Sequence, residues 1–324
     1  MSGLTDVAGL LVGHATDAVG LTGVTAVLCP AGAVAGVAIP GRAARVLGQD
    51  VLDPAHLAEH IHAVVLAGGS AFGLEACFGV MAHLEGQGAG FRTGVAVVPI
   101  VVGAILYDLG LGDARARPDR PMGARAAASA TAGPVAEGSV GAGTGATVGK
   151  AFGLARAMKG GVGTASRRVA AATVGALVAV NAAGDVRDPA TGRLLAGARD
   201  APEGRSLVDA RQAIRDGTVR LAFAPTHTTI GLVATDAPLT RPEAARLAAL
   251  AQGGLAATLS PPHLSVDGDT LFALSTGTVP ATDAPPLDAL GLAAAEAVAE
   301  AVVRAVRTAV SLGGLPAWRD LAER

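Results

Sequence analysis

The stretch APTHTTIGLVATDAPLT, residues 224–240, sets two adjacent hydroxyl side chains before an apolar run. Thr228 and Thr229 precede residues 230–234, whose β-branched and apolar side chains predict a buried strand, and the sequence DAP at 236–238 ends it. Taken alone, this pattern indicates a buried strand that begins with polar residues. A catalytic interpretation of the two threonines requires support from the rest of the chain.

Composition favours a compact globular protein. The chain has 324 residues, of which 51% are hydrophobic, so it can bury a large core, as one large domain or two small ones. Charged residues make up 16% and the net charge is -2, which leaves no basic surface for phosphates or anionic lipids. Aromatic residues make up only 2%, too few for base-stacking platforms. We therefore expect neither nucleic acid nor membrane as a partner.

Cysteine content and the N-terminal sequence favour a cytoplasmic location. Cys29 and Cys77 are too few for a disulfide framework or a zinc cluster. The first ten residues, MSGLTDVAGL, lack the basic region of a signal peptide. The uncharged stretch 19–41 is long enough for a membrane span, but prolines and glycines interrupt it. We interpret it as two buried strands joined by a turn at residues 30–33.

Strand and helix patterns mix along the chain without a strict alternation and without a repeat. Apolar runs predict strands at 23–28, 63–66, 94–102, 174–180, 219–223 and 229–235. Helical spacing predicts three helices. The first covers 70–84 and is capped by Ser70, the second follows the capping box TRPE at 240–243, and the third covers 287–310. The charged, proline-containing residues 112–121 indicate a surface loop. This pattern predicts one α/β (α+β) domain, residues 1–324, with helix layers over a partly antiparallel sheet.

Glycine-rich segments suggest a phosphate-binding loop at first sight. In GSVGAGTGATVGK, residues 138–150, Thr144 stands where a P-loop requires glycine, and Ala151, just after the segment, stands where it requires a hydroxyl. The sequence GAGTGA at 141–146 fits the loose dinucleotide pattern, but no strand pattern precedes it. Nucleotide binding is therefore a weak alternative. The loop could instead bring backbone N–H groups and Lys150 close to a reacting centre.

Histidine spacing gives little support for a metal site. His56 and His60 would share one face of a helix, but no third ligand is patterned with them, so a solvated helix face beside Glu59 is favoured. Three further histidines stand isolated and receive no role: His14, His83 and His263. We expect no metal and no cofactor.

The sequence DGDT at 267–270 places two carboxylates on either side of a glycine. The backbone can turn sharply there and aim Asp267 and Asp269 at one site, where they would titrate as a pair. An ordinary Asp-Gly turn explains the same letters. By itself, the motif favours that simpler interpretation.

Several segments in order resemble one family, the self-cleaving DmpA-type peptidases that include the nylon-oligomer hydrolases (6-aminohexanoate-oligomer endohydrolases). The matching segments are GGSAFGLEA, VPIVVGAILYDLGLGD, GSVGAGTGATVGK, GGVGTAS, VGALVAVNAAGDV, TTIGLVATDAPL and DGDTLFALSTG. The resemblance implies an αββα sandwich of the N-terminal-nucleophile-hydrolase type. It also implies a precursor that cuts itself, here into residues 1–227 and 228–324.

Carried over position by position, the resemblance makes Thr228 the nucleophile and His227–Thr228 the cleavage site. The residues that match the other site positions of the nylon-hydrolase branch are Lys150, Asn181, Asp267 and Asp269, with Tyr107 as an aromatic hydroxyl near the substrate or oxyanion. The aminopeptidase branch typically has a serine nucleophile, so this chain resembles the nylon-hydrolase branch more. Two departures are His227, where relatives commonly have Asn or Gly, and the loop at 39–54.

The implied function is amide-bond hydrolysis through an acyl-enzyme, with nylon-like 6-aminohexanoate oligomers among the candidate substrates. Alternatives are a DmpA-type aminopeptidase (L-aminopeptidase/D-esterase or β-aminopeptidase) and an acyltransferase of the same mechanism. A threonine hydroxyl is a poor nucleophile, and a free α-amine with an ordinary pKa of about 7.7–8.0 can act as its base. That amine exists only after cleavage before Thr228.

Because apolar surface exceeds what one globule hides and relatives assemble, we also expect a homo-oligomer, a tetramer.

Overall fold

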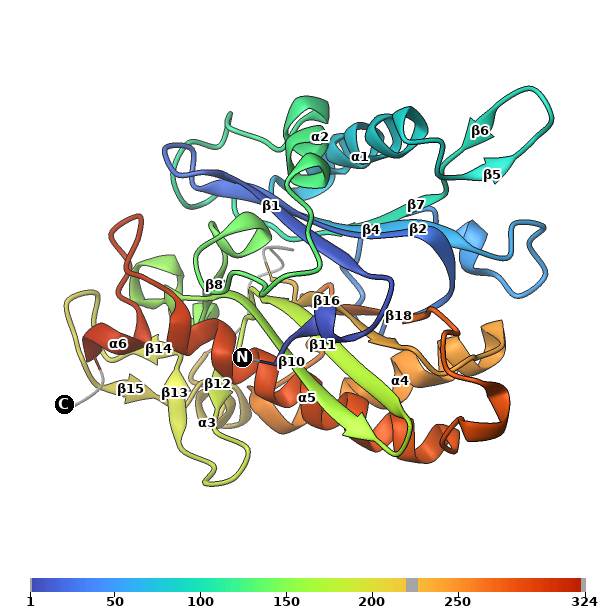
Figure 1. Ribbon diagram of the computed structural model, residues 1–324. Helices are drawn as coiled ribbons and strands as arrows, with labels where there is room; N and C mark the ends of the chain where they lie inside the picture. The colour runs from blue at the N-terminus through green and yellow to red at the C-terminus, as the bar shows by residue number, and fades with distance from the viewer. Residues whose placement is uncertain (1, 220–226, 322–324) are drawn as a thin grey trace.

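The structure, a computed structural model, describes residues 2–219 and 227–321 and has four layers. Helices α1 (Glu75–Gly86) and α2 (Arg120–Ala128) cover one sheet, and helices α4 (Arg241–Thr258) and α5 (Leu287–Thr308) cover a second sheet (Figure 1). The two sheets pack face to face between these helix pairs. This is the αββα sandwich that the sequence resemblance predicted.

The two sheets share a strand and form one hydrogen-bonded path in the order β10-β11-β16-β18-β2-β4-β7-β3, with β1 also paired to β2. Their bounds are β1 (Leu11–Asp17), β2 (Thr22–Ala38), β3 (Val46–Leu47), β4 (Ile61–Ala67), β7 (Val101–Ile105), β10 (Gly161–Val169), β11 (Ala172–Val180), β16 (Ile230–Thr235) and β18 (Thr270–Ser275). Strand β16 runs antiparallel to β11 and parallel to β18. The sheet is therefore mixed, as expected.

Strand β2 connects the two sheets. Its first half pairs with β1 and β4, and its second half pairs with β18. The register with β4 shifts between Leu28 and Ala33, and Gly32 in between has a φ of 89°. The expectation of two strands joined by a turn at 30–33 was therefore wrong. A left-handed glycine bends one long strand without ending it.

Shorter elements gather mainly at one end of the sandwich, around the label α6 in Figure 1. They are β8 (Thr147–Val148), β9 (Met158–Lys159), β12 (Asp185–Arg187), β13 (Leu194–Ala196), β14 (Ala198–Arg199), β15 (Leu207–Val208), β17 (Leu259–Ser260), α3 (Ala210–Arg215) and α6 (Trp318–Leu321). A separate hairpin of β5 (Phe91–Arg92) and β6 (Val97–Val98) projects from the other side (Figure 1). None of the described helices is long and apolar enough to cross a bilayer.

Three apolar clusters account for the layering. Leu177, Leu232 and Phe272 lie between the sheets, whereas Val178 and Val233 face α4 and α5 on the outer side. A third cluster packs α1 and α2 on the opposite sheet. Strands covered on both faces have near-continuous apolar sequences, which is why 174–180 and 229–235 were predicted correctly.

Other predicted elements shift at their ends. Strand 63–66 is confirmed as β4, but 94–102 divides into β6 and β7, and residues 220–223 of the strand predicted at 219–223 lie outside the described residues. The capping box of α4 is present. Ser70 does not cap α1. It has a φ of 55° and begins a 3₁₀ turn, Ser70–Leu74, so α1 itself starts at Glu75.

The surface loop predicted at 112–121 is present but shorter than expected. Asp119 accepts a hydrogen bond from the backbone of Met122 at 2.8 Å and caps α2, which takes the last two residues of that range.

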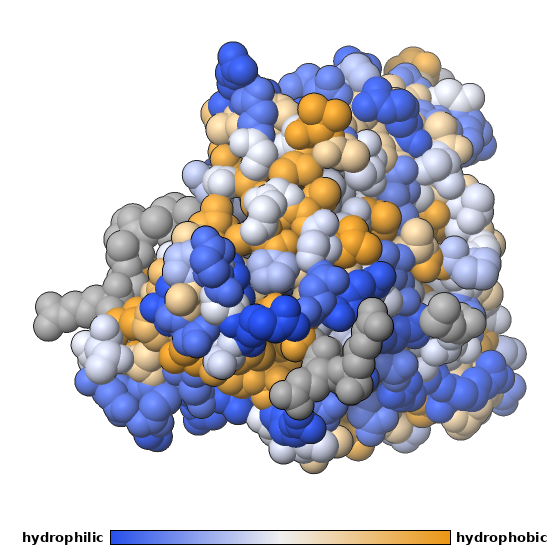
Figure 2. All heavy atoms as spheres, turned by 90° about the vertical axis from the view of Figure 1, so that its left-hand side faces the viewer, coloured by the Kyte–Doolittle hydropathy of each residue, from blue (hydrophilic) through white to orange (hydrophobic). Residues whose placement is uncertain are grey.

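Apolar and charged side chains alternate over the face at the left of Figure 1, and an apolar region runs through its centre (Figure 2). Homo-oligomer formation remains a prediction.

The layering generates a stability prediction with a matched pair of substitutions. Leu232→Ala removes a fully buried side chain from β16 and should lower the free energy of unfolding by about 2–5 kcal/mol. Leu292→Ala shortens a side chain of α5 that is 70% exposed, and it should change the free energy of unfolding by less than about 0.5 kcal/mol. Urea unfolding followed by circular dichroism measures both. Equal losses in the two variants would contradict the assignment of Leu232 to the core between the sheets.

Candidate active site

The ends of three neighbouring strands bring the predicted residues together. Thr228 lies just before β16, Asn181 follows β11, and Gly268 lies just before β18. The N–H of Thr228 donates to the carbonyl oxygen of Asn181 at 3.0 Å, and the N–H of Gly268 donates to the carbonyl oxygen of His227 at 2.9 Å. The peptide between His227 and Thr228 is therefore held by backbone from both neighbouring strands.

The Thr228 hydroxyl lies against the carbonyl group that precedes it. Its Oγ1 donates to the His227 carbonyl oxygen at 2.5 Å, and the residue is 4% exposed. A Cβ atom at Gly268 would lie 2.7 Å from that Oγ1 and 3.0 Å from the backbone of Ala43. Only glycine leaves room there for the Thr228 hydroxyl.

Lys150 places a buried ammonium group beneath this peptide. Its Nζ donates to the carbonyl oxygens of Thr147 and Asn181, each at 3.0 Å, and to the Asn181 Oδ1 at 2.7 Å. Burial lowers the pKa of Lys150 to about 7, against the opposing charge of Asp267. Charged and neutral forms of Lys150 are therefore both available near neutral pH.

Asn181 connects Lys150 to the neighbouring loop and to Tyr107. Its Oδ1 accepts from the backbone of Thr147 at 3.0 Å as well as from Lys150, and its Nδ2 donates to the carbonyl oxygen of Tyr107 at 3.0 Å. Tyr107 thus joins the site through its backbone. No described residue hydrogen-bonds its hydroxyl, which was the group expected to act on a substrate.

Asp269 is surrounded by N–H donors. Its Oδ1 accepts from the backbone of Thr229 at 2.8 Å, and its Oδ2 accepts from the backbone of His263 at 3.1 Å and lies 2.9 Å from the His263 Nδ1. The Asp269 carboxylate is therefore fixed in orientation, and it holds the residue that follows Thr228.

Asp267 has a different environment. Its Oδ2 accepts from the backbone of Leu264 at 2.9 Å, whereas its Oδ1 is buried without a direct hydrogen bond. Burial and the neighbouring charge of Asp269 raise the pKa of Asp267 to about 7. The two carboxylates flank the same glycine but serve different neighbours.

His227 contributes its backbone to the site, and its side chain is 7% exposed. Burial, together with the nearby charge of Lys150, lowers the pKa of His227 to about 3. The imidazole is therefore neutral wherever the enzyme would operate.

The glycine loop acts differently from the expectation. The amides of Ala142, Gly143 and Thr144 donate to Thr25 or within the loop, so they do not reach the Thr228 region. The loop contributes carbonyl groups instead, including the Thr147 oxygen that accepts from Lys150. One N–H of the loop does reach the site, since Thr147 donates to the Asn181 Oδ1 at 3.0 Å, and Lys150 lies there as expected.

A second buried lysine escaped the sequence interpretation. Lys159 is fully buried, and its Nζ donates to the carbonyl oxygens of Thr144 and Ala146, each at 2.7 Å. Burial lowers its pKa to about 7, while the charge of Asp108 opposes that shift. Lys159 thus holds the loop that carries Lys150. Its position between Met158 and Gly160, in an apolar context, was the available signal.

The histidines outside the site do not form a metal centre. Residues 53–60 form a loop, so the expected helix face with His56 and His60 was wrong, and the His62 Nδ1 accepts from the backbone of Ile100 at 3.2 Å. Among the described residues, no group of three or more His, Cys, Asp or Glu side chains could hold a metal ion.

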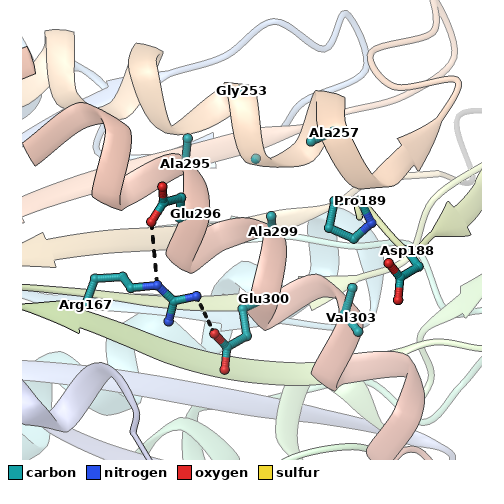
Figure 3. Close-up of a pocket in the computed structure, with 11 residues that line it drawn as sticks. Arg167, Asp188, Pro189, Gly253, Ala257, Ala295, Glu296, Ala299, Glu300 and Val303 are labelled. Carbon is teal, nitrogen blue, oxygen red and sulfur yellow. Dashed lines mark ion pairs between the residues drawn. The ribbon is translucent and has the colours of Figure 1, made fainter. Parts of the chain in front are cut away.

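A cavity of about 480 Å³ lies elsewhere, between α4 and α5. Small residues of both helices line it, and Arg167 at its edge pairs with Glu300 at 2.6 Å and with Glu296 at 3.7 Å (Figure 3). None of the predicted site residues lines this cavity. It belongs to the outer helix layer.

Comparison with known proteins finds relatives over nearly the whole chain. The model of peptidase family S58 matches residues 2–317. A protein of Mycobacterium tuberculosis described as an uncharacterized aminopeptidase is 41% identical, covering 99% of this chain and 98% of its own. A 6-aminohexanoate-oligomer endohydrolase of Kocuria sp. is 31% identical, covering 93% of this chain and 85% of its own.

Solved structures show the same architecture. A β-aminopeptidase of Burkholderia sp. superposes with a TM-score of 0.68 and 27% identity, covering 100% of this chain and 95% of its own. The L-aminopeptidase D-Ala-esterase/amidase of Ochrobactrum anthropi gives a TM-score of 0.72 and 26% identity, covering 95% and 86%. The latter is described as a variant of the N-terminal-nucleophile (Ntn) hydrolase fold. The four layers described above are therefore of that type.

Proposed function

The chain belongs to peptidase family S58 and is a hydrolase of amide bonds, and we propose that its nucleophile is Thr228, exposed when the precursor cuts its own His227–Thr228 bond. One observation carries the proposal. The Thr228 hydroxyl lies 2.5 Å from the His227 carbonyl oxygen, and that oxygen also accepts from the N–H of Gly268 at 2.9 Å. A nucleophile and an oxyanion donor therefore meet at one peptide.

Self-cleavage in this proposal is an intramolecular acyl transfer. The Thr228 Oγ1 attacks the His227 carbonyl carbon, and negative charge develops on the oxygen that Gly268 already contacts. The carbon–nitrogen bond then breaks, which leaves an ester on Oγ1 and a free amine on Thr228. Water hydrolyses the ester to the His227 carboxylate and the Thr228 hydroxyl. An oxyanion donor contributes about 2.7–4 kcal/mol to such steps.

Lys150 is the proposed base for self-cleavage. Its Nζ and the N–H of Thr228 donate to the same carbonyl oxygen, that of Asn181, so one acceptor links the two residues. A base works best when its pKa lies near the operating pH, and burial has lowered that of Lys150 to about 7. Its neutral form could accept the Thr228 hydroxyl proton.

During turnover, the new α-amine of Thr228 takes over as the base. The charged form of Lys150 would lower the pKa of that amine by like-charge repulsion, and Asp267 would stabilise its protonated form. The hydroxyl then attacks the substrate amide, forms an acyl-enzyme and releases an amine. Water completes hydrolysis. The same site with an amine acceptor would be an acyltransferase, so the products distinguish the two.

Two amide classes are the proposed substrates. Relatives named aminopeptidases are 41% identical and favour aminoacyl amides. The 31% identical 6-aminohexanoate-oligomer endohydrolase, together with the resemblance of the site positions to that branch, favours 6-aminohexanoate oligomers. Incubation with both classes, followed by mass spectrometry of the products, decides between them. Release of internal fragments from the oligomer indicates endo-cleavage, and single amino acids released from peptides indicate aminopeptidase activity.

Substitutions at Thr228 test the nucleophile. Thr228→Ala should abolish both self-cleavage and amide hydrolysis because it removes the attacking oxygen, whereas Thr228→Ser and Thr228→Cys should retain part of each. Denaturing electrophoresis and intact mass should show 1–227 and 228–324 in all but the alanine variant. Thr229→Val is the control, since the Thr229 hydroxyl is buried without a partner. Self-cleavage of the Thr228→Ala protein would exclude Thr228 as the nucleophile.

The two aspartates should respond differently to the same change. In Asp269→Asn, the amide NH₂ must face either the N–H of Thr229 or the N–H groups of His263, so one hydrogen bond is lost. Self-cleavage and amide hydrolysis should both slow by about tenfold or more. Asp267→Asn keeps an oxygen for Leu264 and should slow them less. First-order rates of self-cleavage and kcat for hydrolysis measure the difference. A larger loss at Asp267 would reverse the assignment.

Self-cleavage should depend on pH through Lys150. We expect the rate to rise with pH through about 7, as Lys150 loses its proton, while His227 stays neutral throughout. The Asp267 carboxylate raises the pKa of Lys150, so Asp267→Asn should move this rise to lower pH. Precursor refolded into buffers of different pH gives the rates.

The same pH experiment separates the other groups that titrate nearby. The rise would disappear in Asp267→Asn if Asp267 itself were the base, because its own pKa is raised to about 7. The rise in self-cleavage rate would stay at the same pH in Asp267→Asn if Lys159 were the base, since Asp267 is not among the charges that shift the pKa of Lys159. Either outcome would contradict the role proposed for Lys150.

A further inference from the structure

We propose that His263 is a positioning residue for Thr228, acting through Asp269 and the backbone of Thr229. This inference deepens the proposed function and rests on Thr228 being the nucleophile. His263 lies in the segment between β17 and β18, and its sequence surroundings gave it no role. Its ring Nδ1 lies 2.9 Å from the Asp269 Oδ2.

The contacts form a direct path from His263 to the nucleophile. His263 faces one oxygen of Asp269 with both its backbone N–H, at 3.1 Å, and its ring. The other oxygen accepts from the N–H of Thr229 at 2.8 Å. Asp269 is 1% exposed, so its carboxylate relies on these protein donors for its hydrogen bonds. The orientation of the carboxylate therefore depends on the His263 ring.

The chemistry of the pair defines what the ring contributes. An ionised carboxylate only accepts hydrogen bonds, so the His263 Nδ1 must carry a proton in this contact. Without the ring, the Asp269 Oδ2 would retain only the backbone N–H of His263. The carboxylate could then rotate away from Thr229 and shift the Thr228 hydroxyl from its carbonyl target. Small displacements of a nucleophile lower the rate more than they lower substrate binding.

The backbone at His263 suggests well-matched variants. Its φ is 53°, a left-handed conformation that glycine and asparagine adopt with little strain. His263→Gly removes the ring without backbone strain and keeps the backbone N–H. His263→Asn places an amide N–H where the imidazole Nδ1 lies, because both nitrogens are attached to Cγ. His263→Asp has the same shape as asparagine but presents an acceptor to Asp269.

The test compares these variants in the full chain. His263→Gly should lower the self-cleavage rate and kcat by about tenfold, with KM changed less than about twofold, whereas His263→Asn should restore both rates to within about threefold of the parent. His263→Asp should be at least as slow as the glycine variant. Circular dichroism and thermal unfolding check that each variant folds. If His263→Gly does not fold, the comparison of asparagine with aspartate still tests the donor.

Several outcomes would overturn the inference. These are parental rates in His263→Gly, equal rates in the asparagine and aspartate variants, or a loss confined to KM. Thr228→Ala is run in parallel, because self-cleavage by that variant would refute the proposed function itself. An inert Thr228→Ala protein together with an unaffected His263→Gly protein would refute only the role of His263.

Discussion

Two backbone hydrogen bonds hold the His227–Thr228 peptide between its neighbours, one to Asn181 and one from Gly268. Both hydrogen bonds lie at one end of these neighbouring strands, where β11 ends and β16 and β18 begin. Because sheet pairing spaces the strands, the peptide's position follows from the fold before any side chain acts. The sandwich therefore serves as the frame that fixes one carbonyl group beside one hydroxyl group, and the surrounding side chains adjust the chemistry of that pair.

The cost of this frame is the burial of charge. Lys150 and Lys159 lie in the interior near the carboxylates of Asp108 and Asp267, and burial shifts the pKa of each of these groups toward its neutral form. Each lysine is bound by backbone carbonyl groups that surround it, so the interior tolerates it. A tightly packed core keeps water away from Lys150, and this exclusion of water lets an ordinary lysine reach a pKa suited to proton transfer. In the proposed mechanism, the same burial that destabilises the charged form of Lys150 allows it to act as the base.

The sequence predicted the layered fold, and the residues that it singled out lie together around the His227–Thr228 peptide, but it missed several contacts that hold them. Strands such as 174–180 were recognisable because both of their faces are apolar, and the ordered motifs supplied the αββα arrangement. The bend in β2 resembled a turn, since Pro30 and Gly32 favour both structures locally and only pairing with two sheets distinguishes them. Lys159 could not be assigned because its partners, Thr144 and Ala146, lie in a separate loop, and His263 could not because its spacing of six residues to Asp269 matches no motif.

In the proposed mechanism, self-cleavage and turnover use one oxyanion site. The His227 carbonyl oxygen now occupies the place beside the N–H of Gly268, and after cleavage this place becomes available to the carbonyl oxygen of a substrate. The precursor therefore resembles an enzyme with its first substrate already bound, and the first acyl group it transfers is its own chain. This explains why Gly268 must lack a side chain, since a Cβ there would meet the Thr228 hydroxyl in both reactions. It also accounts for the burial of Thr228 in the uncut chain, because the His227 carbonyl group lies against its hydroxyl.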